Sequence, residues 1–163
     1  IDILFIGTNS GRRNTFFAEH AERLAPYRSF LYLPSAATPL VRNQARTVSS
    51  EGMAAIARRS KIVLNIHRDP HCYFEWHRLV QHGILQQALV ISEVTEPAPF
   101  LIPNIDYIEC PTDEIMDACE FYLQHLDLGE TIRHHAYEQV TQRLSMPDIL
   151  AALLTQILSP DPV

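Results

Sequence analysis

The sequence predicts an α/β domain built on a parallel sheet, and three observations lead to this prediction. Short apolar runs alternate along the chain with segments whose apolar residues recur at helical spacing. The apolar runs are hydrophobic at nearly every position, as in strands that are covered on both faces. The chain has 163 residues, of which 47% are hydrophobic, and this size suits one domain with its own core.

The first part of the chain is predicted to fold as strand, helix and strand. Residues 1–7 (IDILFIG) are apolar up to the closing glycine, as in a buried strand. Residues 12–24 carry aromatic and aliphatic side chains at helical spacing, and Pro26 ends that helix. Residues 28–33 (RSFLYL) form the second strand. Residues 35–47 have no clear periodicity and are predicted to be a loop.

The middle of the chain repeats this alternation. Ser49 or Ser50 is suited to cap a helix that runs to about residue 59, and residues 61–67 (KIVLNIH) form the third strand. After a loop at 68–72, a helix is predicted over 73–82 because Gly83 is a typical C-terminal signal. The fourth strand is predicted at residues 88–92 (ALVIS).

The last part of the chain is predicted to be mainly helical. Residues 93–103 are too rich in proline for a central strand, and 106–110 suit a short edge strand. Thr112 or Asp113 is expected to cap the helix after Pro111. Two more helices are predicted, at 130–144 and, with a proline in its first turn, at 147–158. The apolar side of the last helix is expected to pack either on this domain or on another one.

These elements together predict a Rossmann-like, doubly wound parallel sheet with helices on both faces and a helical C-terminal end. The expected division is a domain over residues 1–145, followed by a C-terminal helix and tail over 146–163. In such sheets ligands bind beyond the carboxyl ends of the strands. The residues that directly follow each apolar run are therefore the candidates for a functional site.

Composition narrows the possible partners. The formal charge of −6 argues against a broad electrostatic contact with nucleic acid or an anionic membrane. No apolar run is long enough to span a membrane and no signal segment opens the chain, so a soluble, cytoplasmic protein is expected. Cys72, Cys110 and Cys119 form no CxxC pair and are expected to be buried free thiols.

The first candidate site follows the first strand, where GTNSGRR (7–13) leads into a helix. Gly7 lets the backbone approach a ligand, and a helix start with Arg12 and Arg13 favours anions such as a diphosphate. The segment matches neither GxGxxG nor the Walker pattern. An ordinary turn with two solvated arginines would have the same sequence, so the segment alone is a weak signal.

Polar residues follow the third strand as well. Alternation places Asn65 and His67 on one face of that strand, where a buried asparagine must be hydrogen-bonded to backbone or to a ligand. Four histidines lie at 67, 71, 77 and 82, but no HExxH motif or paired helical arrangement with an acidic ligand accompanies them. We therefore expect no metal site.

Two further candidates lie later in the chain. On a helix, Glu75 and Arg78 are three residues apart and can pair, and with His77 they could face a polyhydroxylated ligand. A simple intrahelical salt bridge is the alternative. Glu93 follows the fourth strand and could accept hydrogen bonds from sugar hydroxyls, although an exposed loop carboxylate would have the same pattern.

A resemblance to a known family rests on three segments and their order: GTNSGRR (7–13), SKIVLNIH (60–67) and FEWHRLVQHGILQQALVISE (74–93). With these segments the chain resembles the C-terminal, donor-binding domain of GT-B glycosyltransferases. The group related to spore-maturation proteins looks most similar. The resemblance implies a nucleotide-sugar donor held between two Rossmann-like domains, of which this chain would be the second. The N-terminal acceptor domain would be absent from this chain, and the chain alone is expected to bind donor weakly and to transfer little sugar.

Carried over by position, the resemblance implies that Gly7, Arg12 and Arg13 lie near the donor phosphates and that Asn65 and His67 line the cleft. Glu75, His77 and Arg78 would match the helix that contacts the donor sugar and ribose. Many members have a ribose-binding glutamate five residues before the glycine, where this chain has Arg78. Glu75, one helical turn earlier, is the candidate replacement.

The resemblance implies no cofactor besides the nucleotide-sugar substrate. Family members largely stabilise the leaving diphosphate with cationic side chains and helix amides, a role open here to Arg12, Arg13 and Lys61. No catalytic residue is assigned, because the general base of inverting members belongs to the N-terminal domain.

Two other classes of function remain open. A noncatalytic Rossmann-like binding or regulatory module is supported by the replacement of the usual glutamate. A flavodoxin-like or receiver domain is less well supported, because a receiver needs an acidic cluster after the first strand and GTN stands there.

Overall fold

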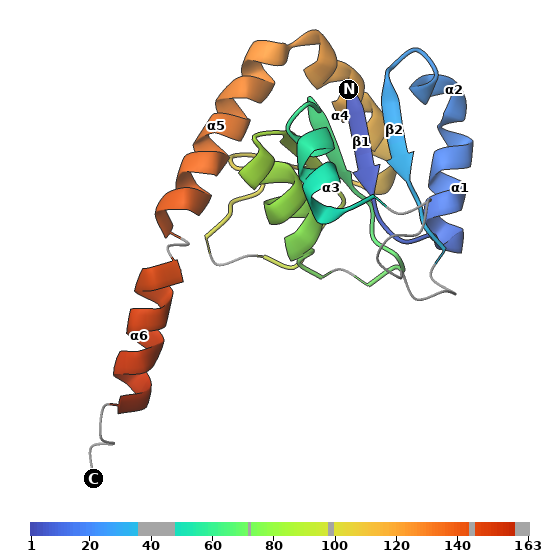
Figure 1. The fold of residues 1–163 in the computed structure, drawn as a ribbon. Helices are drawn as coiled ribbons and strands as arrows, with labels where there is room; N and C mark the ends of the chain where they lie inside the picture. Colours follow the sequence, from blue (N-terminus) through green and yellow to red (C-terminus); the bar gives the residue numbers. More distant parts are fainter. Residues whose placement is uncertain (36–47, 72, 98–99, 144–145, 159–163) are drawn as a thin grey trace.

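The computed structural model describes residues 1–35, 48–71, 73–97, 100–143 and 146–158 (Figure 1). Its centre is a five-stranded parallel sheet in the order β2-β1-β3-β4-β5. The strands are β1 (Ile3–Ile6), β2 (Ser29–Tyr32), β3 (Ile62–Asn65), β4 (Leu89–Ser92) and β5 (Ile108–Glu109). Each lies within a predicted strand, and the parallel arrangement is confirmed. The predicted loop at 35–47 lies, apart from residue 35, outside the described residues.

Helices of three kinds connect and follow the strands. The α-helices are α1 (Gly11–Glu19), α2 (Ala21–Leu24), α3 (Ser50–Ala57), α4 (Ile115–Gln124), α5 (Leu126–Arg143) and α6 (Met146–Leu158). A π-helix, η1 (His77–Gly83), is followed directly by the 3₁₀ turn η2 (Ile84–Gln86), and a second 3₁₀ turn, η3 (Thr112–Glu114), precedes α4.

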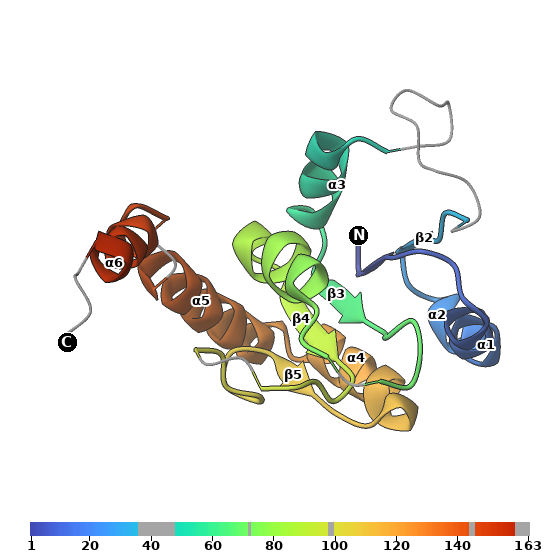
Figure 2. The same ribbon diagram turned by 90° about the horizontal axis from the view of Figure 1, so that it is seen from below.

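Helices cover both faces of the sheet, which confirms the doubly wound fold (Figure 2). Successive strand residues alternate between the two faces, so Ile3 and Phe5 pack with α1 and α4, whereas Leu4 packs with α3. The strands are apolar at nearly every position because both sides of each strand are buried. The core of the first face also includes Phe16, Phe17, Leu64, Ile115 and Met116. A second cluster of buried side chains on the other face consists mainly of Leu79, Val80, Val90, Ala136 and Val140.

The chain reverses its direction of winding between β1 and β3. From β1 it continues outward to β2 and then returns to the other side of β1, where β3 lies. Such a reversal opens a crevice beyond the carboxyl ends of the two central strands, and ligands of doubly wound sheets bind there. Flavodoxin-like domains share this strand order. The order therefore locates a site but does not select one class of function.

Three predicted helices differ from those in the structure. The helix predicted over 12–24 is interrupted at His20, which separates α1 from α2. The helix predicted over 73–82 does not begin until Trp76, so Glu75 precedes it. The last of the three, predicted over 130–144, already begins at Leu126.

The predicted cap after Pro111 is also wrong. Neither Thr112 nor Asp113 caps a helix with its side chain, because both lie within the 3₁₀ turn η3 that Pro111 precedes. The Thr112 hydroxyl instead accepts a hydrogen bond from Arg12. A side chain expected to serve local structure therefore contacts a distant residue.

Helix α6 begins with the proline turn that the sequence predicts, but it does not pack on the described part of the domain. Its residues from 147 to 158 are all exposed, with Ile157 and Leu158 each at 75%. In Figure 1 it extends away from the sheet. No described helix is both long and apolar enough to cross a membrane.

The cysteines agree with the expectation of free thiols where they are described. Cys119 is buried and Cys110 is half-buried, and both are free. Burial raises the pKa of the Cys110 thiol to about 11, which keeps it protonated near neutral pH. Cys72 lies outside the described residues.

Candidate functional site

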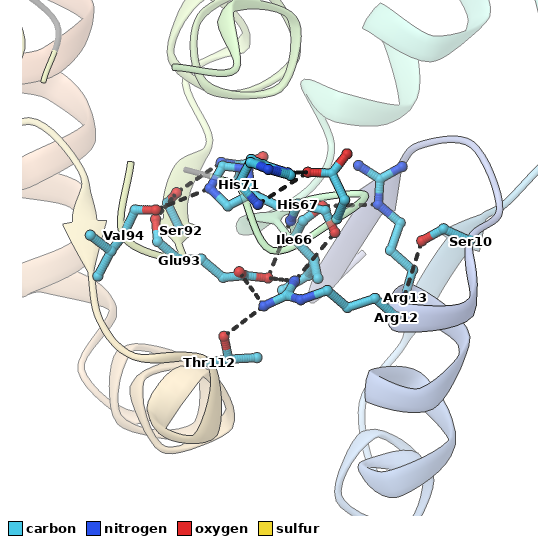
Figure 3. A network of polar contacts seen from close by, with 12 residues as sticks. Ser10, Arg12, Arg13, Ile66, His67, His71, Ser92, Glu93, Val94 and Thr112 are labelled. Atoms are coloured by element: carbon cyan, nitrogen blue, oxygen red, sulfur yellow. Dashed lines mark hydrogen bonds and ion pairs between the residues drawn. The ribbon is translucent and has the colours of Figure 1, made fainter. Parts of the chain in front are cut away.

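Most of the predicted site residues meet at the carboxyl edge of the sheet, beside the reversal between β1 and β3. Figure 3 shows four of them, Arg12, Arg13, His67 and Glu93. We call the whole set the carboxyl-edge network. Its members come from α1, from the ends of β3 and β4, from the segment around η1 and from η3: Arg12, Arg13, Asn65, His67, Glu75, Arg78, Ser92, Glu93 and Thr112. Segments far apart in sequence are thus joined where a doubly wound sheet binds its ligand.

Arg12 forms a two-pronged ion pair with Glu93. Its Nη1 and Nη2 atoms lie 2.5 and 2.6 Å from the two carboxylate oxygens. Nη2 also donates to the Thr112 hydroxyl at 3.1 Å. The arginine side chain is 30% exposed and that of the glutamate 7%, so the pair forms part of the surface of the edge. Paired guanidinium and carboxylate groups of this geometry fix each other's orientation.

Arg13 is buried and holds two loops together. Its Nε donates to the carbonyl of Ile66 at 2.9 Å, and its Nη1 donates to the carbonyl of Thr8 at 2.7 Å. The guanidinium also lies 5.3 Å from the centre of the Phe5 ring. Only 1% of the residue is exposed. Arg13 therefore joins the end of β1 to the end of β3 and does not face solvent as a phosphate ligand would.

Arg78 is the second buried arginine of the network. Its Nε donates to Asn65 Oδ1 at 2.7 Å, and its Nη2 pairs with Glu75 at 2.7 Å. The predicted pairing with Glu75 is confirmed, although the glutamate precedes the helix. Asn65 in turn donates to the Ser92 hydroxyl at 2.9 Å, which joins β3 to β4. The asparagine is thus hydrogen-bonded within the protein.

Burial lowers the pKa of both buried arginines. Burial, followed by the nearby charge of Arg78, lowers the pKa of Arg13 to about 10. Burial also lowers the pKa of Arg78, whereas Glu75 opposes that shift. Two cations at one strand edge favour the approach of an anion, because a negative ligand would relieve their repulsion.

His67 is almost fully buried and has one ring nitrogen without a partner. Its Nε2 lies 3.0 Å from the Val94 carbonyl, which can only accept, so this nitrogen carries the proton. Nδ1 is then an acceptor, and it is buried with no hydrogen-bond partner among the described residues. The backbone amide of His67 donates to Glu93 at 3.2 Å. The structure therefore brings these two predicted site residues into direct contact.

The expected donor contacts of Gly7 and His77 stay predictions. The Gly7 amide donates to Tyr32 at 3.0 Å, and a Cβ at Gly7 would lie 2.8 Å from the Phe5 ring, so the glycine serves packing. His77 is exposed at the start of η1, and among the described residues its side chain forms no hydrogen bond or ion pair with the carboxyl-edge network. Lys61 lies at the opposite edge of the sheet, where it pairs with Asp2 at 2.8 Å.

Three residues at this edge were missed by sequence reasoning. Ser92 and Thr112 look like ordinary strand-end and capping residues, and Phe5 looks like a core residue. Only the position of Ser92 at a strand end could have indicated its role. Thr112 is separated from Arg12 by 100 residues, so its contact could not be inferred from local pattern.

A groove lies beside Arg12, between α1 and η3. It has a volume of about 520 Å³ and is lined by Arg12, Thr15, Phe16, Glu19, His20, Thr112 and Asp113. The first turn of α1 also adjoins the network, and its backbone N–H groups have no partners within the helix. Ser10 caps this turn by accepting from the Arg13 amide at 3.3 Å.

Histidine, cysteine and carboxylate side chains do not form a group of three suited to a metal ion anywhere in the described residues. His71 pairs with Asp69 at 3.0 Å on an exposed loop, and His67 is directed to Val94. The chemistry that the edge offers is therefore that of arginines, carboxylates and helix amides.

Two solved structures with a similar fold illustrate the likeness of this chain to known proteins. One is the C-terminal domain of the glycosyl transferase group 1 family protein LpcC from Francisella tularensis, with a TM-score of 0.65 and 13% identity over 88% of this chain and 86% of that one. The other is TarM, with a TM-score of 0.63 and 14% identity over 97% of this chain. The chain spans about a third (35%) of TarM.

At these identities the likeness shows the fold alone, a Rossmann-like α/β fold that this chain shares with the C-terminal domain of LpcC and with part of TarM. No protein-family model matches the chain, and no curated protein matches it either.

Proposed function

We propose that this domain is the donor-binding half of a glycosyltransferase that moves a sugar from a nucleotide-diphosphate donor to an acceptor. One observation carries the proposal: three arginines and the start of α1 lie together where the winding of the sheet reverses between β1 and β3. The fold likeness to the LpcC domain supports it. An acceptor-binding domain is then the expected partner, and we propose no metal or further cofactor.

The geometry refines which groups would contact the donor. Arg13 and Arg78 are held inside the domain, so they would act on the diphosphate through their charge and by shaping the loops. The partly exposed Arg12 and the first-turn amides of α1 would contact phosphate oxygens directly. A cation and helix amides that are fixed before binding stabilise the negative charge that develops on a leaving diphosphate.

Glu75 and Glu93 are the proposed contacts for hydroxyl groups of the donor. Each already accepts from an arginine, yet a carboxylate has more acceptor positions than those bonds use. Glu75 is held by Arg78, the residue that replaces the glutamate of many GT-B enzymes. Arg78 would therefore orient the substitute carboxylate rather than bind ribose itself.

A titration tests the proposal. We expect a panel of UDP-, GDP- and TDP-sugars to include one that binds the chain with a dissociation constant below about 1 mM, as measured by calorimetry. Arg12→Ala and Glu75→Gln should each weaken it about tenfold, since each removes a charge-assisted hydrogen bond. Glu96→Gln, which changes an exposed loop carboxylate, is the matched control. Thermal unfolding of each variant checks that the fold is kept.

The outcome that contradicts donor binding is a panel in which no nucleotide-sugar binds below about 10 mM. Chelation of divalent metals should leave the affinity largely unchanged, because the proposed contacts are arginine and amide groups. Strict dependence on magnesium or zinc would contradict that part of the proposal.

A noncatalytic binding module is the second candidate, and one observation favours it. The guanidinium groups of Arg12, Arg13 and Arg78 are all hydrogen-bonded inside the domain, which is what a retained fold without chemistry would show. The same titration separates the two candidates. Equal affinities for a nucleotide diphosphate and for its sugar conjugate would mean that the sugar is not recognised, as expected for a module of this kind.

A further inference from the structure

A second cleft lies at the amino edge of the sheet, opposite the carboxyl-edge network. It has a volume of about 350 Å³ and is bounded by the end of α3, the starts of β3 and β4, and the facing sides of α4 and α5. In Figure 1 the amino edge of the sheet is the upper one, where β1 starts beside the N-terminus. We call it the amino-edge cleft. The residues that matter here are Arg58, Arg59, Lys61, Tyr122, Leu126 and Arg133.

The cleft is strongly cationic in a chain of negative net charge. Its lining includes four of the 13 basic residues and one carboxylate, that of Glu130. Lys61 is paired with Asp2 at 2.8 Å, and Arg133 is paired with Glu130 at 2.7 Å. These two cations are thereby neutralised and held in place.

Arg58 and Arg59 differ from the other two cations. Both are exposed, and within the described chain neither guanidinium has a hydrogen bond or an ion pair. Two guanidinium groups that line one cleft are well suited to bind a phosphate dianion, because each offers a fork of N–H donors. The amino-edge cleft therefore has two positive charges that the described part of the protein does not use.

The other lining residues favour a ligand with an apolar part. Ile62 and Leu89 line the cleft together with Leu126, which is 49% exposed, and the ring of Tyr122. Burial raises the pKa of the Tyr122 phenol, so its hydroxyl remains a hydrogen-bond donor. Ligand sites commonly combine apolar walls with a few polar groups that fix the orientation of the ligand.

Compensation of the α3 dipole explains only part of this arrangement. Arg58 and Arg59 follow the last residue of α3, where positive charge stabilises a helix. That effect is confined to the last turn of the helix, whereas Lys61 directly precedes β3 and Arg133 lies within α5. Cations from three separate parts of the chain therefore line one cleft, and only those of Arg58 and Arg59 have no ion pair within the described residues.

We propose that the amino-edge cleft binds a small organic phosphate whose phosphomonoester group lies between Arg58 and Arg59 and whose apolar or aromatic part packs against Tyr122 and Leu126. This inference does not depend on the proposed donor site. The two sites occupy opposite edges of the same sheet and share no residue.

Calorimetric titrations with phenyl phosphate and with inorganic phosphate test the inference. Phenyl phosphate should bind the chain with a submillimolar dissociation constant, about tenfold more tightly than inorganic phosphate, because its ring is removed from water. The double variant Arg58→Ala/Arg59→Ala should weaken phenyl phosphate at least about tenfold. Arg143→Ala, an exposed arginine near the end of α5 and outside the cleft, should bind as the unchanged chain does.

Three results would overturn the inference. The first is no binding of phenyl phosphate below about 10 mM, and the second is equal affinity in the double variant. The third is displacement of phenyl phosphate by a saturating nucleotide-sugar, which would mean that both occupy one site. Failure of the donor titration with normal phenyl phosphate binding would overturn only the proposed function.

A lipid could supply the same phosphomonoester, so vesicles of phosphatidylcholine with and without phosphatidic acid form a separate arm. No cosedimentation of the chain with either kind of vesicle is the expected result. Sedimentation with phosphatidic acid vesicles that is lost in the double variant would overturn the choice of a small soluble ligand.

Discussion

The two edges of the sheet use arginine in opposite ways. At the carboxyl edge, Arg13 and Arg78 are buried and bonded to carbonyl, amide or carboxylate oxygens of the domain. At the amino edge, Arg58 and Arg59 are exposed and have no such bonds to the described residues. The difference shows that the number of arginines at an edge does not measure how many can bind a ligand.

The carboxyl edge owes this arrangement to the need to hold loops together. Three strand-end loops meet there, and their carbonyl groups need donors because a buried acceptor without a partner is costly. Arg13 supplies donors to the carbonyls of Thr8 and Ile66, whereas Arg78 donates to the side chains of Asn65 and Glu75. The amino edge has fewer such needs, because neighbouring backbone groups bond one another, as between Leu89 and Lys61 at 2.9 Å.

The largest effect that would sharpen this comparison is expected from Arg13→Leu. The substitution leaves the carbonyls of Thr8 and Ile66 without their donor, so it should lower the free energy of unfolding by about 3 kcal/mol. Arg59→Leu at the other edge should change it by less than about 0.5 kcal/mol. Urea unfolding of both variants measures the two values. Similar losses in the two variants would contradict the division between structural and free arginines.

A smaller effect is expected from Glu93→Gln. This change removes the charge that Arg12 contacts through two bonds and weakens the acceptor of the His67 amide, so the free energy of unfolding should fall by about 2 kcal/mol. The same measurement on Glu96→Gln, whose carboxylate is exposed, serves as control and should show almost no change. An unchanged stability in Glu93→Gln would mean that the ion pair is not formed in solution.

The smallest effect is expected at the amino edge, from Asp2→Asn. Hydrogen bonds from Arg28 and then Lys61 hold the pKa of Asp2 well below its ordinary range, so the ionised form stabilises the fold. Because Arg28 is 76% exposed, the loss at pH 7 should be only about 1 kcal/mol. The depressed pKa means that this stabilisation is complete above the unfolded value near 4 and is lost as the pH falls toward the folded value.

Thermal unfolding of the unchanged chain and of Asp2→Asn between about pH 7 and pH 3 checks the sign of this dependence. The difference between the two should be constant down to about pH 5 and should shrink below it. A difference that grows as the pH falls would contradict the assigned role of Asp2.

Sequence periodicity was sufficient for the sheet but not for the helix that carries Arg78. The strands could be predicted because each is covered on both faces and therefore apolar at nearly every position. The π-helix could not, because its geometry depends on packing: a Cβ at Gly83 would lie 2.2 Å from Val90 Cγ2 on β4. Arg78 lies five positions before Gly83, and on a π-helix its side chain has another direction than it would have on an α-helix.

Most residues of the candidate site converge on one edge of the sheet, but the contacts among them were not foreseen. The rule that ligands bind beyond strand ends selected Arg12, Asn65 and Glu93, and the structure brings all three to one edge. The segment GRR does not indicate which of its two arginines is buried. Arg13 is the buried one because its guanidinium bonds the carbonyl of Ile66 in the loop after β3. Gly7 was interpreted as a ligand-facing residue, and the structure adds a packing reason for the glycine, because a Cβ there would meet the Phe5 ring and Arg13.

The measurement that tests the central claim most directly is a map of backbone amide shifts by NMR as a nucleotide-sugar is added to the chain. Donor binding at the carboxyl edge predicts that the largest shifts occur at residues 8–13, at His67 and at Glu93, with little change at 58–61. Shifts confined to residues 58–61 and 129–133, or no shifts at millimolar donor, would contradict the assignment of the donor site.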